Sequence, residues 1–241
     1  MPLIQYLEAA KNIFFPPVCF SCSRKITKGL LCLGCYQKIE FIKPGGCRFC
    51  LEPLKSNKKG LCRECAKDPP AYSRLISIAY YKNPLINLIR SFKYKNYDFL
   101  ARYLSNLIIE SLKKESGLLG KYDFITSVPM HPFKHTQRGY NQAELLAKEI
   151  GKSFKMPYEN DIIVEHSFKH SQATLKGTQR RDNVKNAFSA KSSVKGKKII
   201  IVDDIFTTGA TIKACACALS EKGTLDILAV TLAKTAPLSD E

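Results

Sequence analysis

The stretch KKIIIVDDIFTTGATI, residues 197–212, decides the fold of this chain. Four apolar residues (199–202) run into the adjacent acids Asp203 and Asp204, and a threonine–glycine loop follows before a helical pattern begins. An unbroken run of β-branched residues is typical of a strand buried on both faces, as in a parallel sheet. The loop then lies where the carboxyl end of a strand meets the amino terminus of a helix. Free backbone N–H groups and the helix dipole favour a phosphate at that place.

The two acids beside this loop would repel a phosphate unless they hold something else, and ribose hydroxyls or a Mg²⁺ ion fit that role. The stretch resembles the 5-phosphoribosyl-1-pyrophosphate (PRPP) motif of type I phosphoribosyltransferases, with every position filled. The resemblance implies that Asp203 and Asp204 hold the ribose hydroxyls, with metal partly through water. It also implies that the 5′-phosphate is held by the loop Phe206, Thr207, Thr208, Gly209, Ala210 and Thr211. The alternative is an ordinary strand–turn–helix unit with a solvated acidic pair.

Eight of the ten cysteines form four Cys-x-x-Cys pairs, which are Cys19/Cys22, Cys32/Cys35, Cys47/Cys50 and Cys62/Cys65. One such pair offers two thiolates to a tetrahedral metal, so four pairs predict two structural Cys₄ zinc sites. We expect sequential pairing of the four pairs, with a cross-braced arrangement as the alternative. Disulfides are the alternative to zinc, and the absence of a secretory pattern disfavours them. Cys215 and Cys217 lie apart from the pairs and are expected to be buried free thiols.

The order of the patterns predicts an α/β protein with a doubly wound parallel sheet and an amino-terminal double zinc ribbon. We expect an amino-terminal helix at 1–18, the double zinc ribbon at 19–66 and a phosphoribosyltransferase-like domain at 67–241. The further strands are expected at 74–81, 124–128, within 157–165 and at 225–235. The helices are expected from Pro84, over 99–115, from near Asn141 and over 209–222.

The chain is strongly basic, with 38 Lys+Arg against 21 Asp+Glu and a formal net charge of +17. This balance favours nucleic acid, an anionic membrane or phosphorylated substrates as partners, although a solvated lysine-rich surface is the alternative. Lys93, Tyr94, Lys95 and Tyr97 interleave basic and aromatic groups in a manner that suits single-stranded nucleic acid. Their alternative role is the end of an amphipathic helix. No run of 18 apolar residues is present, so we expect a cytoplasmic protein, with peripheral contact at the inner face of the cytoplasmic membrane as a second expectation.

The chain as a whole resembles the ComF family of competence proteins. The resemblance rests on the Cys-x-x-Cys pairs after Phe-Pro-Pro, on VPMHPFKHTQRGYNQAELLA at 128–147 and on the PRPP stretch. The run Arg138-Gly139-Tyr140-Asn141-Gln142 is its most specific part. The resemblance implies a phosphoribosyltransferase fold that binds PRPP with Mg²⁺, carries structural zinc and acts in natural transformation. It also implies single-stranded DNA and a competence helicase, translocase or DNA-processing protein as partners.

The same resemblance assigns the rest of the PRPP site. The turn Val128, Pro129, Met130 and His131 matches the pyrophosphate loop, with Lys134 and Arg138 as nearby cations. Arg138 is counted with the two acids as a catalytic candidate. Residues 169–185 resemble the flexible loop that closes over PRPP, and its candidate cations are Arg180, Arg181 and Lys185. The alternative for all these cations is surface charge.

These patterns favour a PRPP- and DNA-binding protein of DNA uptake. One alternative is a metabolic phosphoribosyltransferase that acts on a small base or amine. A second alternative is a non-enzymatic adaptor whose ribbons dock a helicase or translocase. Whether the site turns over is left open by the sequence, because no stretch is typical of a base-specific hood. A complete glutamine-dependent amidotransferase is not expected, because no amino-terminal catalytic cysteine is present.

Overall fold

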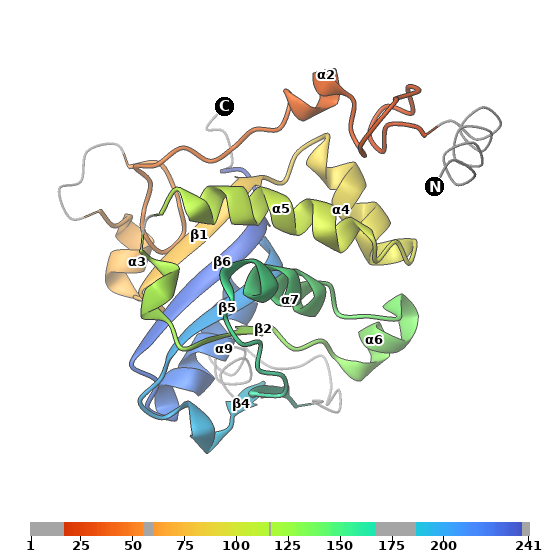
Figure 1. The fold of residues 1–241 in the computed structure, drawn as a ribbon. Helices are drawn as coiled ribbons and strands as arrows, with labels where there is room; N and C mark the ends of the chain where they lie inside the picture. The colour runs from red at the N-terminus through yellow and green to blue at the C-terminus, as the bar shows by residue number, and fades with distance from the viewer. Residues whose placement is uncertain (1–16, 55–59, 116, 167–186, 238–241) are drawn as a thin grey trace, which may run out of the picture.

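A computed structural model describes residues 17–54, 60–115, 117–166 and 187–237 of the chain. The expected amino-terminal helix at 1–18 therefore lies outside the described residues except for its last two positions. The main sheet is parallel, and its strands in spatial order are β1 (Arg74–Tyr80), β6 (Asp226–Lys234), β5 (Lys198–Phe206) and β2 (Phe124–Ser127). Figure 1 shows β5 and β6 in the middle of this sheet. The predicted α/β architecture with a parallel sheet is confirmed.

The apolar run in β5 is buried on both faces, as its composition predicts. Ile200 and Val202 join one hydrophobic cluster, whereas Ile199 and Ile201 join a second cluster on the other side of the sheet. None of the four side chains is exposed to solvent. β5 is longer than the apolar run, because it continues through the two acids to Phe206 and pairs there with Lys234 of β6. The acids therefore stand on the rigid end of a strand and not in the following loop.

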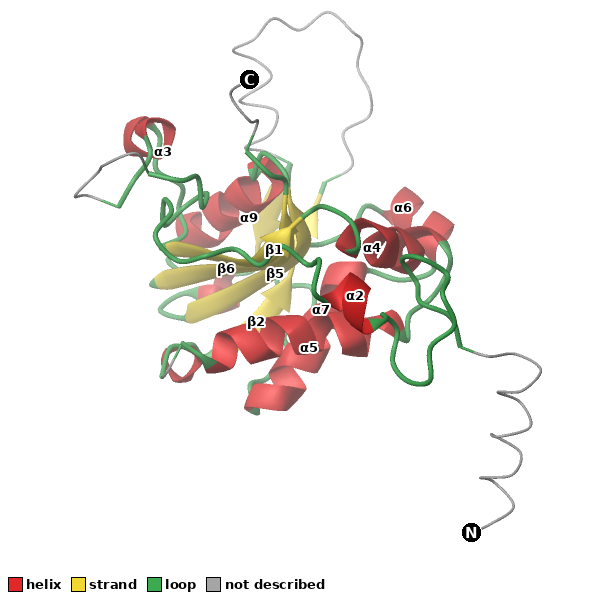
Figure 2. Ribbon diagram, turned by 90° about the horizontal axis from the view of Figure 1, so that it is seen from above, coloured by secondary structure: helices red, strands yellow, loops and turns green. Residues whose placement is uncertain are grey.

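Helices cover both faces of the sheet, as expected of a doubly wound fold. One face carries α4 (Leu85–Tyr94), α5 (Leu100–Lys113) and α7 (Gln142–Phe154), and the other carries α9 (Ala210–Glu221). Figure 2 shows α5 and α7 on one side of the strands and α9 on the other. The short 3₁₀ segments are Leu119–Lys121 and Ser192–Val194.

One helix was not predicted from the sequence. Residues after Met130 are expected as a proline-bounded turn, but Pro132–Arg138 form the helix α6. Proline suits the first turn of a helix because its missing N–H would be unpaired there anyway. His131 caps this helix by accepting the Phe133 N–H at Nδ1, at 3.2 Å. Gly139, at φ 74°, then ends the helix in the left-handed conformation that glycine adopts without strain.

A small antiparallel pair, β3 (Ile163–Glu165) with β4 (Phe188–Ala190), packs against α9. β3 lies within the segment expected to hold a short strand, so that expectation is confirmed. Among the described helices, none is long and apolar enough to cross a lipid bilayer.

The cysteine pairs form two separate ribbons. The amino-terminal ribbon holds Cys19, Cys22, Cys32 and Cys35 and includes α2 (Leu33–Tyr36), whereas the second ribbon holds Cys47, Cys50, Cys62 and Cys65 and includes α3 (Arg63–Lys67). The segment between them runs antiparallel beside the edge strand β1. The Ile42 N–H donates to the Ile78 carbonyl at 2.9 Å, and the Tyr80 N–H donates to the Glu40 carbonyl at 2.9 Å. The inter-ribbon segment thus covers the free edge of the sheet.

Candidate functional site

A cleft of about 410 Å³ opens at the carboxyl ends of β5 and β2. In open parallel α/β sheets, ligands bind in the crevice outside these strand ends. The cleft gathers predicted site residues from three segments, and these are Val128, Pro129, Met130, His131, Lys134, Arg138, Asp203, Asp204, Ala210 and Thr211. Residues far apart in the sequence therefore line one space, as the PRPP resemblance implies.

The acidic pair forms the floor of this cleft. The Asp203 carboxylate accepts a hydrogen bond from the Asp204 N–H at 2.8 Å. Burial and the adjacent Asp204 carboxylate raise the pKa of Asp203 to about 7, against the opposing charges of Lys93 and Lys134. Two carboxylates this close do not both ionise easily without a cation. The pair therefore requires a positive partner.

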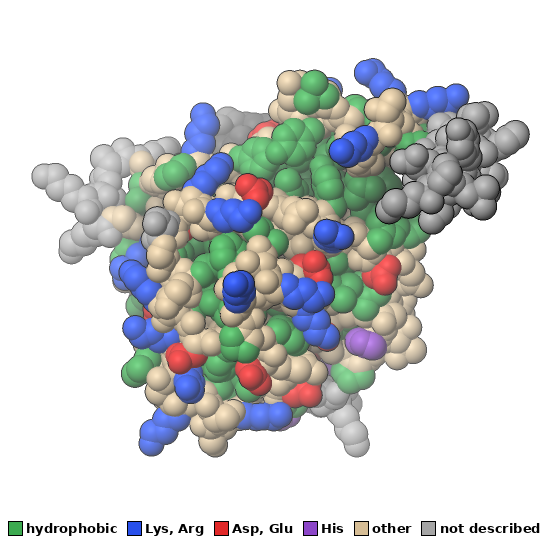
Figure 3. All heavy atoms as spheres, viewed as in Figure 1, with side chains coloured by type: hydrophobic (Ala, Val, Ile, Leu, Met, Phe, Trp, Pro, Cys, Tyr) green, Lys and Arg blue, Asp and Glu red, His purple; other side chains and the backbone are tan. Residues whose placement is uncertain are grey.

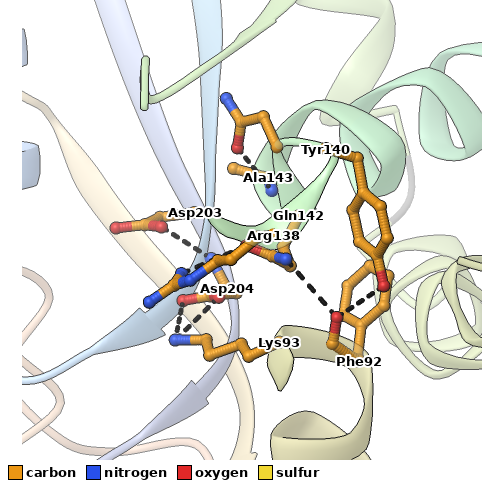
Figure 4. A network of polar contacts seen from close by, with 9 residues as sticks. Phe92, Lys93, Arg138, Tyr140, Gln142, Ala143, Asp203 and Asp204 are labelled. Atoms are coloured by element: carbon orange, nitrogen blue, oxygen red, sulfur yellow. Dashed lines mark hydrogen bonds and ion pairs between the residues drawn. The ribbon is translucent and has the colours of Figure 1, made fainter. Parts of the chain in front are cut away.

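Lys93 supplies that positive partner. Its Nζ lies 2.9 Å from Asp204 Oδ1 and 2.8 Å from Oδ2 (Figure 4). Lys93 is the residue that sequence reasoning missed at this site, because the sequence places it in the basic–aromatic segment suited to nucleic acid. The two partners are 111 residues apart in the chain, and no local pattern links them.

The run from Arg138 to Gln142 fastens α4 to the cleft. The Tyr140 hydroxyl donates to the Phe92 carbonyl at 2.6 Å, and the Gln142 Nε2 donates to the same carbonyl at 3.4 Å. Phe92 directly precedes Lys93, so these bonds fix the turn of α4 that carries the lysine. Arg138 donates to Gln142 Oε1 at 3.2 Å and lies 5.2 Å from the centre of the Tyr94 ring. Figure 4 shows this network converging beside the acidic pair.

Asn141 joins the turn after β2 to α7. Its Nδ2 donates to the Val128 carbonyl at 3.0 Å, and its Oδ1 caps α7 by accepting the Ala143 N–H at 3.0 Å. Asn141 is nine-tenths buried, so water competes little for these bonds. The family-specific run therefore has a positional role that its sequence does not reveal.

The threonine–glycine loop follows β5 and leads into α9. Gly209 has φ 76°, and a Cβ at this position would lie 2.4 Å from the Phe206 ring. Only glycine fits this turn without a shift of the ring. Thr207 and Thr208 are exposed and line a second cleft together with Cys50 and Glu52 of the second ribbon. Phe206, Thr207 and Gly209 also border a hollow of about 10 Å³ inside the loop, roughly the space of one water molecule.

The predicted cations of the flexible loop, Arg180, Arg181 and Lys185, lie outside the described residues. The structure adds Glu165 of β3 to the cleft wall. Burial raises the pKa of Glu165, whereas His131 and Lys134 oppose the shift. No local pattern in the sequence connects this acid with the PRPP stretch.

Each ribbon brings its four sulfur atoms within 4.8 Å of one another. The sets are sequential pairs of Cys-x-x-Cys motifs and not the cross-braced alternative. Tetrahedral zinc with bonds of about 2.3 Å places its sulfur ligands about 3.8 Å apart. Cys22 and Cys32 are separated by 3.8 Å, and Cys50 and Cys62 by 3.5 Å. The donor sets therefore fit zinc.

The thiols of each ribbon differ in how readily they ionise without metal. Burial alone would raise the pKa of Cys19, but backbone N–H groups of Cys32, Cys22 and Ser21 lower it to about 6. Burial likewise opposes ionisation of Cys47, and hydrogen bonds from the backbone lower its pKa to about 7. Burial and the neighbouring sulfurs raise the pKa of Cys35, and of Cys50 in the second ribbon, to about 12. Zinc supplies the charge that ionises such thiols together.

The remaining cysteines lie on α9, away from both ribbons. Cys215 is fully buried, as predicted, whereas Cys217 is only partly buried. Burial raises the pKa of the Cys215 thiol well above its ordinary value.

Two family models match this chain. A phosphoribosyl transferase domain matches residues 137–239, and a double zinc ribbon domain matches residues 10–69. The first match contains the PRPP stretch, and the second contains all eight paired cysteines.

Curated relatives extend over most of the chain. Competence protein F of Haemophilus influenzae is 31% identical over 89% of this chain and 95% of its own length. DNA utilization protein YhgH of Escherichia coli K12 is 28% identical over 85% of this chain and 97% of its own length. Competence protein ComFC of Streptococcus pneumoniae is 27% identical, covering 85% of this chain and 87% of its own.

Among solved structures, glutamine phosphoribosylpyrophosphate amidotransferase from B. subtilis is 18% identical with a TM-score of 0.41. The alignment covers 59% of this chain and 30% of that structure.

Proposed function

This chain belongs to the competence protein F family, and from that premise we propose that it binds PRPP with Mg²⁺ and binds single-stranded DNA during DNA uptake. The names of its relatives, a competence protein and a DNA utilization protein, support the role in DNA uptake. We place the protein in the cytoplasm, at the inner face of the cytoplasmic membrane, with a helicase, translocase or DNA-processing protein as partner.

One observation carries the PRPP proposal. The acidic pair, the start of α9 and the cations Lys134 and Arg138 line a single cleft. The acids would accept hydrogen bonds from the ribose hydroxyls, and the loop before α9 would hold the 5′-phosphate. The loop between β2 and α6, residues 128–131, would hold the pyrophosphate. The ribose hydroxyls, the 5′-phosphate and the pyrophosphate of PRPP would thus each contact residues of complementary chemistry.

The residues that line the cleft could also promote transfer of the phosphoribosyl group from PRPP to an acceptor. The bond between C1 of the ribose and the pyrophosphate oxygen would break, with its electron pair leaving on pyrophosphate. An acceptor lone pair would form the new bond at C1, and the acceptor proton would pass to solvent. Lys134 and Arg138 would stabilise the charge that develops on the leaving group. Mg²⁺, for which carboxylate oxygens are suitable ligands, would neutralise further phosphate charge when bound.

Exposed aromatic side chains support the DNA proposal. Tyr94, Tyr97 and Phe99 are 68%, 37% and 54% exposed, and they follow one another at the end of α4. Lys95 stands between them. Each base of a single strand could stack on such a ring, while lysine and arginine neutralise the phosphates. Lys and Arg side chains are spread over the face in Figure 3, which suits binding without sequence preference.

Calorimetric titration with Mg²⁺-PRPP tests the first half of the proposal. We expect the wild type to bind and Asp203→Asn to weaken binding by about 1–3 kcal/mol, because charge-assisted hydrogen bonds to the ribose are lost. Asp123→Asn is the control, since Asp123 is an exposed acid remote from the cleft. A wild type that does not bind PRPP would overturn this half.

Filter binding of single-stranded DNA over a salt series tests the second half. Tyr94→Ala combined with Phe99→Ala is expected to cost about 1–3 kcal/mol for each stacked base. Tyr36→Ala is the matched control, since Tyr36 is similarly exposed but lies on α2 of the amino-terminal ribbon. Binding that shows no salt dependence, or that ignores the double substitution, would contradict the proposed surface.

The intact cleft also favours a second candidate, a phosphoribosyltransferase acting on a small base or amine. Release of pyrophosphate from PRPP across a panel of such acceptors is the measurement. Turnover above the rate of hydrolysis alone would support an enzyme. A silent panel despite PRPP binding would leave PRPP as a regulatory ligand.

A further inference from the structure

Lys93 stands where the chemistry of this cleft calls for a cation. Its ammonium lies within 2.9 Å of both oxygens of Asp204, and the two side chains are only 16% and 11% exposed. Lys93 also lines the cleft itself. An ammonium has three N–H donors, and this carboxylate engages at most two of them. One donor remains for a ligand in the cleft.

The position of this ammonium is fixed in advance of any ligand. The preceding carbonyl, that of Phe92, accepts hydrogen bonds from Tyr140 and Gln142 at 2.6 and 3.4 Å. Lys93 also lies in the last turn of α4, where a cation is favoured by the helix dipole. A donor held in place before binding costs little ordering when the ligand arrives.

The charge of the cleft depends on this residue. Among the described residues that line it, Lys93, Lys134 and Arg138 are cationic, and Glu165, Asp203 and Asp204 are acidic. Formal charges therefore cancel when all the acids are ionised. Without Lys93 the acids outnumber the cations by one, and the cleft would repel a polyanion unless a metal ion entered with it.

We infer that Lys93 is a ligand-binding residue that acts as an internal counter-cation, holding Asp204 and donating to the pyrophosphate of a phosphoribosyl ligand, so that binding survives without divalent metal. This inference rests on the proposed binding of PRPP. It assigns to one lysine of α4 part of the neutralisation that a divalent ion supplies. The matching ligand class is a sugar phosphate that carries a pyrophosphate group.

The test compares PRPP affinity by calorimetry in excess Mg²⁺ and in EDTA for wild type, Lys93→Met and Lys95→Met. Lys95 is the matched control because it is exposed, two residues away and outside the cleft wall. We expect wild type and Lys95→Met to lose no more than about tenfold in EDTA. Lys93→Met is expected to lose at least about a further tenfold in EDTA and to recover most of its affinity in Mg²⁺.

A variant that keeps the charge completes the design. Lys93→Arg is expected to retain binding in EDTA, and Lys93→Gln replaces Lys93→Met if that variant does not fold. The unfolding temperature of each variant without ligand checks the fold.

Three results would overturn the inference. One is a wild type that binds PRPP only with Mg²⁺, which leaves the proposed function intact. Another is Lys93→Met losing affinity by the same factor in both media, or binding more tightly than wild type. The third is a wild type that binds PRPP in neither medium, which removes the proposed function as well.

Discussion

The two ribbons share one ligand chemistry but are joined to different parts of the molecule. The amino-terminal ribbon packs into the cluster of α4 and α5, and the Asn87 Nδ2 of α4 donates to the Ser21 carbonyl at 3.2 Å. The second ribbon packs into the cluster of α9 on the opposite face of the sheet. There Glu52 forms a 2.7 Å ion pair with Lys234 at the end of β6.

This difference connects the amino-terminal ribbon to the acidic pair of the cleft and the second ribbon to the threonine–glycine loop. α4, beside the amino-terminal ribbon, carries Lys93 over the acidic pair. Lys234, beside the second ribbon, adjoins Thr235, whose N–H donates to the Phe206 carbonyl at 3.0 Å. The side chain of Thr235 also donates to the Thr207 carbonyl at 3.3 Å. The two zinc sites have the same ligands, but they lie beside different parts of the molecule because their packing partners differ.

The largest expected effect is loss of one zinc ion from either ribbon. Cys22→Ser and Cys50→Ser should each reduce bound zinc from two ions to one and lower the free energy of unfolding by about 4 kcal/mol or more. Metal analysis and denaturant titration measure these losses. Cys50→Ser should also weaken PRPP binding about tenfold, because Cys50 shares a cleft with Thr207 and Thr208. Equal losses of PRPP affinity in the two variants would contradict the proposed difference between the ribbons.

The next effect is loss of the ion pair that fastens the second ribbon to β6. Glu52→Gln leaves the ammonium of Lys234, only 3% exposed, without its partner and should cost about 3 kcal/mol. Glu40→Gln is the matched control, because its pair with Lys82 is about half exposed on both sides. Exposed pairs contribute roughly 0–1 kcal/mol. Denaturant titration should therefore separate the two variants, and similar costs would contradict a structural role for the pair between Glu52 and Lys234, which is buried on its lysine side.

Acidification should release zinc from the second ribbon before it releases zinc from the amino-terminal ribbon. The lower pKa of Cys19, about 6 against about 7 for Cys47, means that protons displace zinc from the amino-terminal ribbon at a lower pH. A thiol with the higher pKa takes up its proton first as pH falls, so the stability that zinc provides is present at high pH and is lost first in the second ribbon. A chromogenic chelator follows zinc release from Cys22→Ser and Cys50→Ser, each of which retains one ribbon. Zinc release from the amino-terminal ribbon at the higher pH would contradict this prediction.

The smallest effect concerns the link between the amino-terminal ribbon and α4. Asn87→Ala removes a hydrogen bond worth about 1 kcal/mol but gains about 0.5 kcal/mol in helix propensity. The net change in unfolding free energy should therefore stay within about 0.5 kcal/mol. Zinc content and PRPP affinity should match those of the wild type. A loss above about 2 kcal/mol would show that this ribbon depends on α4 as strongly as the second ribbon depends on β6.

Local patterns predicted the parts of the fold that local chemistry controls. The apolar run before Asp203 identified the buried strand, and the cysteine spacing identified both ribbons. Gly209 marked a turn that only glycine fits. In each case a few neighbouring residues determine the structure. The missed helix α6 shows the opposite case, because Pro132 is typical of both a turn and a helix start.

Long-range partners could not be predicted in the same way. Lys93 and Asp204 are 111 residues apart, and Glu52 and Lys234 are 182 residues apart. Lysine and acidic residues are common, and nothing in their local sequence selects these pairs. Their contacts arise from the topology of the sheet. The sequence therefore indicated the chemistry of the PRPP loop but not the cation opposite it.

The position of β6 has a consequence for biosynthesis. β6 is the last of the described strands along the chain, yet it separates β1 from β5 in the sheet. Ser73, which directly precedes β1, donates to the carbonyl of Ile227, 154 residues further along the chain. The main sheet therefore cannot close until residues 226–234 have been synthesised, and such distant pairings fold slowly. Each ribbon draws its ligands from 20 residues or fewer, so both can bind zinc while synthesis continues. We therefore expect both zinc ribbons to form on the nascent chain before the main sheet does.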